Sequence, residues 1–141
     1  MNLYAESSAV LAWLLGEREG DIVRDTLRQA EFVVASDLTL VECDRVLIRA
    51  LAMQEVEEAA AADLRAYLSA AASHWHVWRV SSEIVERARR PFPGEPVRTL
   101  DAIHLASALS ARSALPELKL LSLAGRIREV GRRLGFEIVP Q

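Results

Sequence analysis

The chain has 141 residues, of which 51% are hydrophobic and 26% are charged, and its formal net charge is −3. This composition excludes wholesale disorder and fits one globular domain with a core of its own. The chain lacks any run of about 18 apolar residues, which excludes a membrane span, and its single cysteine, Cys43, excludes an internal disulfide. Because the N-terminus also lacks a basic region, it does not resemble a signal peptide, and we expect a cytoplasmic protein.

The charge is distributed unevenly along the chain. Residues 1–78 carry 6 arginines and 13 acidic residues, a balance of −7, whereas residues 79–141 carry 11 basic and 7 acidic residues, a balance of +4. A basic half favours contact with a phosphate backbone, but the overall acidity argues against strong non-specific binding to nucleic acid. On charge alone, the simpler interpretation of the basic half is that its arginines are scattered over the surface and solvated.

Strands and helices are expected to alternate through the first half of the chain. A short apolar stretch ends at Glu6, and Ser7 or Ser8 would cap the following helix by accepting a hydrogen bond from a free N–H. Compact β-branched runs predict strands, whereas apolar residues three or four positions apart predict helices. The expected elements are strands over residues 2–5 and 32–36, and helices over 7–17, 20–30, 37–52 and 54–72.

The second half continues this alternation around one loop. The stretch "PFPGEP" at residues 91–96 contains three prolines and a glycine, which end the helix before it. Thr99 is the expected cap of the next helix, and Gly135 is expected to close the last one. The expected elements are strands over residues 76–80, 118–123 and 136–139, and helices over 81–90, 99–112 and 125–135.

The order of these elements predicts the fold class. Strands that alternate with helices form a mostly parallel sheet with helices on both faces. We therefore expect residues 1–141 to form a single α/β domain with a central sheet of four to five strands.

Acidic and hydroxyl side chains recur where the predicted strands end. Glu6 follows the first strand, Glu42 lies in the helix after the second, Asp101 heads the helix that leads into the fourth, and Ser122 ends that fourth strand. Ligands of open α/β sheets bind outside the carboxyl ends of the strands. Three carboxylates far apart in sequence are therefore expected to converge on one rim.

Such a set of carboxylates favours a hard divalent cation. Oxygen ligands without neighbouring cysteine or histidine suit Mg²⁺ or Mn²⁺. A bound Mg²⁺ lowers the pKa of water, polarises a phosphoryl oxygen and orients in-line displacement, which fits hydrolysis of phosphodiesters. Without a cation, crowded carboxylates repel one another and one pKa is strongly raised.

Each acidic residue also has a simpler structural interpretation when it is taken alone. Asp101 would complement a helix N-terminus, Glu42 would be a solvated helix residue, and Glu6 would be a loop acid. His104 lies three positions beyond Asp101 on the same helix face, and for it we favour a hydrogen-bonding or packing role over metal ligation.

Other residues whose types can bind metals or stack on bases are assigned structural roles. The pair His74 and His76 is spaced i, i+2 before a strand, which is weak support for a metal site. Cys43 is expected to be a small core residue. The tryptophans Trp13, Trp75 and Trp78 are expected to be core anchors.

Four segments together resemble the PIN-domain ribonucleases, in particular the VapC-like toxins of type II toxin–antitoxin pairs. The segments are "LYAESSAVLAWLLGE", "LTLVECDRVLIRA", "RTLDAIHLASAL" and "LLSLAGRIREVGRRLGFEIV", and they cover essentially the whole chain in the family's order. Glu6, Glu42 and Asp101 stand at the acidic positions of the first three segments. The third segment is the most specific of the family's motifs.

The resemblance implies a PIN-like three-layer α/β/α fold and a magnesium- or manganese-dependent endoribonuclease. The implied catalytic and metal-binding residues are Glu6, Glu42 and Asp101, and the implied substrate-binding residues are Ser7 and Ser122. It also implies an RNA substrate, a cognate antitoxin that silences the acidic site, and often a homodimer. None of this follows from composition.

Two positions depart from the family pattern. The first acid is Glu6 where Asp is usual, which moves the carboxylate by roughly 1.5 Å, about one C–C bond. Ala124 occupies the usual position of a fourth acid, although Ser122 is retained nearby. These departures support an alternative hypothesis, a PIN-fold protein with weakened catalysis that acts by binding a partner protein or RNA. A phosphorylated receiver domain has the same sheet type but is disfavoured, because the chain lacks an early acidic pair.

Overall fold

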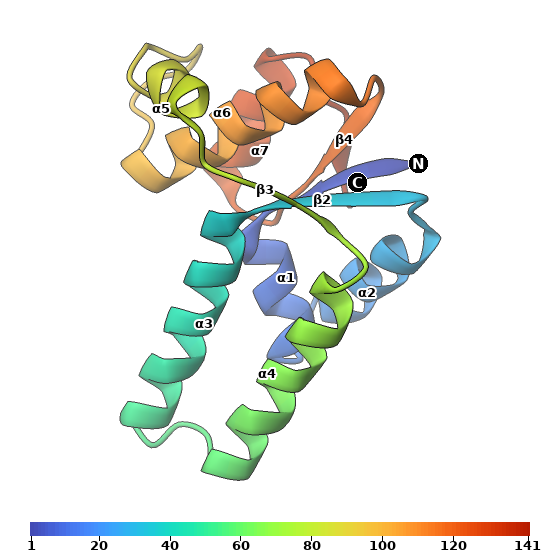
Figure 1. The fold of residues 1–141 in the computed structure, drawn as a ribbon, viewed down its shortest axis with the longest axis vertical. Coiled ribbons are helices and arrows are strands. Elements are labelled where there is room, and N and C mark those ends of the chain that lie inside the picture. The colour runs from blue at the N-terminus through green and yellow to red at the C-terminus, as the bar shows by residue number, and fades with distance from the viewer.

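The computed structural model describes residues 1–141 and has a central parallel sheet with helices on both faces (Figure 1). The five strands are β1 (Asn2–Ala5), β2 (Phe32–Ser36), β3 (His76–Trp78), β4 (Leu118–Leu121) and β5 (Ile138–Val139), in the order β3-β2-β1-β4-β5. The seven helices are α1 (Ser7–Leu14), α2 (Gly20–Gln29), α3 (Asp37–Ala52), α4 (Glu58–Ala72), α5 (Ser82–Ala88), α6 (Thr99–Ala114) and α7 (Gly125–Arg133). The predicted three-layer α/β/α fold is confirmed.

Each face of the sheet has a hydrophobic core of its own, because neighbouring strand residues point to opposite faces. Tyr4 and Leu120 belong to the core on the side of α5, α6 and α7, whereas Leu3 and Leu121 belong to the core under α1 to α4. Cys43 is fully buried in the second core, as expected. The three tryptophans pack against these cores, also as expected: Trp13, Trp75 and Trp78. None of the helices has the length and apolar character needed to cross a membrane.

Two helix caps differ from the prediction. Helix α1 is capped by Glu6, whose Oε1 accepts a hydrogen bond from the N–H of Ser8 at 3.1 Å, and Ser7 is the first residue of the helix. Glu6 has extended backbone angles and Ser7 already has helical ones, so the acid and not a serine stands at the N-cap. Helix α6 begins at Thr99, and the residue at its N-cap, Arg98, makes no capping bond through its side chain.

The parallel register brings the ends of β1 and β4 together. Ala5 pairs with Leu121 in the central strand pair, and the N–H of Glu6 donates to the carbonyl oxygen of Leu121 at 3.0 Å. Because both strands end at the same edge, Glu6 and Ser122 are neighbours although 116 residues separate them. This edge also leads directly into α1 and α3.

Helix α7 packs unusually close to the sheet through Gly131. A Cβ atom at this position would lie 2.6 Å from a methyl group of Leu120 and 2.9 Å from one of Ile138. Only glycine permits this approach without displacing the two side chains. Ala124 stands at the N-cap of this helix.

Candidate active site

The three predicted acidic residues lie around the carboxyl edge of the sheet, each on a different element. Glu6 follows β1, Glu42 lies in the second turn of α3, and Asp101 lies in the first turn of α6. The pKa of the Asp101 carboxyl is raised, first by partial burial and then by the charge of Glu6, with a smaller contribution from Glu42. Asp101 is therefore close enough to Glu6 and Glu42 for its ionisation to respond to their charges.

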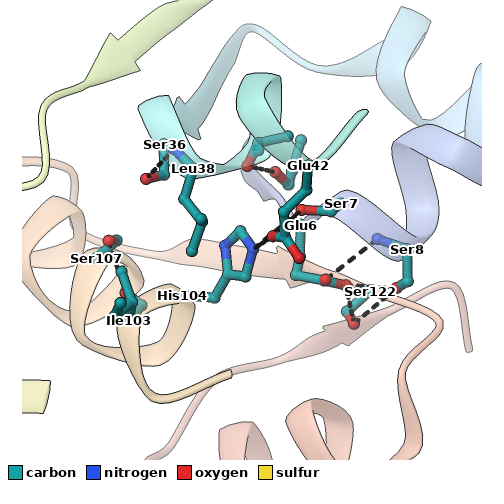
Figure 2. Close-up of polar contacts among 12 residues, drawn as sticks. Glu6, Ser7, Ser8, Ser36, Leu38, Glu42, Ile103, His104, Ser107 and Ser122 are labelled. Atoms are coloured by element: carbon teal, nitrogen blue, oxygen red, sulfur yellow. Dashed lines mark hydrogen bonds and ion pairs between the residues drawn. The ribbon is translucent and has the colours of Figure 1, made fainter. Parts of the chain in front are cut away.

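The Glu6 carboxylate is buried and turned toward serine side chains. Its exposed fraction is 4%, and its Oε2 accepts hydrogen bonds from the hydroxyls of Ser122, at 2.7 Å, and Ser8. Figure 2 shows Glu6 and Ser8 gathered with Ser122 at the end of β4. These bonds compensate the cost of burying a carboxylate without a cationic partner. Ser8 was not singled out by the sequence analysis as a partner of the acid.

The Glu42 carboxylate is held by two donors. Its Oε1 accepts a hydrogen bond from the hydroxyl of Ser7 at 2.7 Å and lies 2.5 Å from Nε2 of His104 (Figure 2). Partial burial raises the pKa of Glu42, but the hydrogen bonds from His104 and Ser7 outweigh this effect and lower it overall. Glu42 is therefore kept ionised near neutral pH.

Asp101 is the least restrained of the three acids, because its side chain makes no hydrogen bond or ion pair within the protein. It is half-buried and lines a cavity of about 570 Å³ at the start of α7. The same cavity is lined by Ala124 and by the arginines Arg98 and Arg126. A carboxylate faces a basic, open space here, which suits contact with a ligand.

The serines predicted to bind substrate have other contacts in this structure. Ser7 is 3% exposed and donates to Glu42, and Ser122 is fully buried and donates to Glu6. Ser122 also accepts a hydrogen bond from the N–H of Ala124 at 3.1 Å. Both hydroxyls thus orient carboxylates, and their contact with substrate stays a prediction.

Two buried residues extend the polar cluster beyond the predicted set. His104 has the hydrogen-bonding role that the sequence analysis favoured, and the hydroxyl of Tyr4 lies 2.9 Å from its Nδ1. Tyr4 had no sequence signal, because an aromatic residue in a buried strand is ordinary core. His74 and His76 belong to no group that could hold a metal ion.

The chemistry of the donors suits Mg²⁺ or Mn²⁺, although the present conformation brings together no group of three His, Cys, Asp or Glu side chains for a metal. Mg²⁺ keeps several waters and is usually bound through one or two carboxylates plus substrate phosphates. Glu42 and Asp101 supply two such carboxylates, whereas both oxygens of Glu6 are occupied by Ser8 and Ser122. The fit therefore rests mainly on Glu42 and Asp101.

The opposite pKa shifts predict opposite effects on the stability of the metal-free protein. The folded state raises the pKa of Asp101, so ionisation of this residue costs stability as the pH rises above its unfolded pKa. The folded state lowers the pKa of Glu42, so its charge contributes stability that is lost as the pH falls through the folded pKa. At pH 7, Asp101→Asn should therefore raise Tm and Glu42→Gln should lower it.

Thermal melts of both variants between pH 3 and pH 8, in the presence of a chelator, measure this difference. The difference in Tm between the two variants should become smaller toward acidic pH, where both native carboxyls are protonated. If Asp101→Asn lowers Tm as much as Glu42→Gln does, Asp101 is a structural residue.

The fold and this arrangement of acids define a class of protein. Residues 3–130 match the PIN domain family, and the chain belongs to that family. Among the similar proteins of Mycobacterium tuberculosis, Ribonuclease VapC46 is 31% identical over 137 residues, which are 97% of this chain and 95% of that protein. Ribonuclease VapC35 is 27% identical over 139 residues, with the same shares of the two chains. The chain is thus VapC-like, as the motifs predicted.

Solved structures with the same fold include a toxin and a toxin–antitoxin complex. VapC20 of Mycobacterium tuberculosis, a toxin described as cleaving the sarcin–ricin loop, aligns with a TM-score of 0.65 at 16% identity over 95% of each chain. A toxin–antitoxin complex from Klebsiella pneumoniae aligns with a TM-score of 0.64 at 18% identity, over 99% of this chain and 97% of that one. At these identities the likeness establishes the fold.

Proposed function

We propose that this protein is a divalent-metal-dependent endoribonuclease and the cytoplasmic toxin of a toxin–antitoxin pair. The observation that carries the proposal is that Glu42 and Asp101 both lie at the carboxyl edge of the sheet, where partial burial and, to a smaller extent, the charge of Glu42 raise the pKa of Asp101. Glu42 is held ionised by two donors, whereas Asp101 faces an open cavity. The ribonuclease names of VapC46 and VapC35, aligned over nearly their full lengths, support the reaction type.

The residues of this chain would divide the reaction between them. Glu42 and Asp101 would bind Mg²⁺ or Mn²⁺ through oxygen. Glu6 would contribute negative charge near the cation without binding it directly. The cation would polarise the phosphoryl group and lower the pKa of water. Both carboxylates would also orient the attacking water next to the cation.

The arginines beside Asp101 support a polyanionic substrate. Arg98 is exposed and its side chain has no ion pair or hydrogen bond within the protein. The Arg126 side chain makes only long contacts, at 3.3 Å to the carbonyl of Gly94 and 3.4 Å to Glu129. Guanidinium groups bind phosphate in a bidentate manner. We therefore assign Arg98 and Arg126 to the RNA backbone next to the scissile phosphate.

An exposed apolar face on α3 supports an antitoxin partner. Val41 and Ile48 are 55% and 42% exposed, and their spacing of seven residues places them on the same side of the helix. Met53, which follows the helix, is 59% exposed. In Figure 1, α3 extends away from the sheet beside α4. The exposure of these side chains leaves them available to a second protein. A homodimer, as the family resemblance implies, is part of the same proposal.

A second function, binding with weakened catalysis, is favoured by two observations. Ala124 supplies no fourth carboxylate, and the oxygens of Glu6 are satisfied by serines. Under this hypothesis the protein binds RNA or a partner protein but cleaves slowly or not at all. Cleavage of a labelled RNA at saturating Mn²⁺ separates the two functions.

Millimolar Mn²⁺ is expected to raise the Tm of the protein, because a ligand that binds only the folded state stabilises it by mass action. Asp101→Asn should abolish the metal-dependent shift while the protein remains folded, since the substitution is nearly isosteric and removes only the charge. The measurement is a thermal melt in chelator and across a Mn²⁺ titration. A wild-type melt that Mn²⁺ leaves unchanged would argue strongly against a functional metal site.

A further inference from the structure

His104 is a fully buried imidazole whose two nitrogens both have polar partners. Its exposed fraction is 1%, Nδ1 lies 2.9 Å from the hydroxyl of Tyr4, and Nε2 lies 2.5 Å from Oε1 of Glu42. Nε2 is also 3.0 Å from the hydroxyl of Ser7. The imidazole thereby connects β1, α1 and α3 to α6, and Figure 2 shows it pointing from α6 toward Ser7 and Glu42.

The partners determine which nitrogen carries the proton. Oε1 of Glu42 already accepts from the hydroxyl of Ser7, so Nε2 is the N–H that donates to the same carboxylate oxygen. In a neutral imidazole Nδ1 then carries the lone pair, and the hydroxyl of Tyr4, 2.9 Å away, is its donor. A phenol is protonated at neutral pH and can supply this donor. The hydrogen bonds therefore run in one direction, from Tyr4 through His104 to Glu42.

Both donors act on the same oxygen of Glu42. Ser7 and His104 each bond Oε1, whereas Oε2 has no hydrogen-bond partner within the protein. A carboxylate held in this way cannot rotate without losing two bonds, one of them to a group with no exposure to solvent. The free oxygen is consequently presented in a fixed direction.

We propose that His104 is a positioning residue that, oriented by Tyr4, locks Oε1 of Glu42 and presents Oε2 to the divalent cation. The inference rests on the proposed function, in which Glu42 is a metal ligand. Replacing a side chain that hydrogen-bonds to a metal ligand and orients it typically changes metal affinity or activity by about 10–100-fold. A role limited to packing would leave the direction of the carboxylate unaffected.

Two amide substitutions separate positioning from packing. In His104→Gln the side-chain amide reaches the position of Nε2 and can still donate to Glu42. In His104→Asn the amide reaches only the position of Nδ1, so Glu42 loses this donor. Both variants lose the imidazole ring and its packing. Tyr4→Phe removes the orienting hydroxyl alone, and Tyr67→Phe, at a tyrosine that is 59% exposed on α4, is its matched control.

The readouts are Mn²⁺ affinity by calorimetry, and the kcat and KM of RNA cleavage. We expect His104→Asn to weaken Mn²⁺ binding and reduce kcat by about 10–100-fold. His104→Gln should keep most of the Mn²⁺ affinity and most of kcat, although its Tm should fall as that of His104→Asn does. Tyr4→Phe should be intermediate and Tyr67→Phe unchanged. Equal losses of affinity in the Gln and Asn variants, or no loss in either, would overturn the inference.

The ¹⁵N spectrum of the metal-free protein tests the same inference without metal or RNA. The His104 ring should show a protonated Nε2 and an unprotonated Nδ1, and the signal of Nδ1 should move in Tyr4→Phe. If the wild-type protein binds no Mn²⁺ and cleaves no RNA, the proposed function fails, while the ring signals still report on the hydrogen bonds. A protonated Nδ1 with a bare Nε2 would refute the positioning role even if the protein is an active nuclease.

Discussion

Asp101→Asn and Glu42→Gln should each reduce RNA cleavage by about a hundredfold or more, because each removes a carboxylate that holds the cation and water against the scissile phosphate. The double variant should be scarcely slower than either single variant, since residues that act as a unit are not additive. Initial rates on a labelled RNA at fixed Mn²⁺ measure all three. Non-additivity distinguishes a shared ion from two independent contributions to folding.

Glu58→Gln and Asp63→Asn are matched controls for this experiment. Both residues are exposed on α4, and Glu58 lies at the end of this helix that is far from the sheet (Figure 1). These variants should cleave at the wild-type rate. Cleavage that persists unchanged in Asp101→Asn and Glu42→Gln would point to a contaminating nuclease or to a different active site.

The position of the acids at one edge of the sheet was predictable from the sequence, whereas the direction of their side chains was not. Parallel strands end at one edge, so the order of the elements alone placed Glu6, Glu42 and Asp101 on the same rim. Whether Glu6 faces a ligand depends on which hydrogen-bond donors nearby compete for its carboxylate. Its longer side chain folds back to cap α1 and to accept from Ser8 and Ser122, and no periodicity in the sequence encodes that choice.

The buried hydrogen bonds behind Glu42 were harder to foresee for a different reason. Tyr4 and His104 are 100 positions apart, and each reads as a core residue within its own element. They meet only because β1 is the central strand and α6 packs on the same face of the sheet as the Tyr4 ring. Contacts of this kind follow from tertiary packing, which local sequence patterns do not describe.

Ala124→Asp is expected to tighten Mn²⁺ binding by about tenfold, which corresponds to roughly 1.4 kcal/mol. Ala124 and Asp101 line the same cavity, so an aspartate at position 124 places a further carboxylate beside the proposed ion. RNA cleavage should rise at limiting Mn²⁺ and less at saturation, because the added ligand acts on metal occupancy. Titration by calorimetry and rates across a Mn²⁺ series measure the two effects.

The structure changes what this substitution should do to the metal-free protein. Repulsion among the acids alone would destabilise the fold slightly. Ala124, however, is the N-cap of α7 and provides no side-chain capping bond, and an aspartate there adds about 1 kcal/mol of capping energy. Arg98 and Arg126 also line the cavity and offset the new charge. We therefore expect the metal-free Tm of Ala124→Asp to equal or exceed that of the wild-type protein.

Ala124→Asn separates capping from metal binding, since asparagine caps a helix as well as aspartate does but has no charge. It should stabilise the fold without raising Mn²⁺ affinity. Combining Ala124→Asp with Glu6→Asp then asks whether the longer first acid compensates for the missing fourth one. If it does, the gains in affinity will not add, because both side chains act on the same ion. An Mn²⁺ affinity that is flat or lower in Ala124→Asp would show that residue 124 does not face the acids, and the loss of a fourth carboxylate would then not explain any weakness in catalysis.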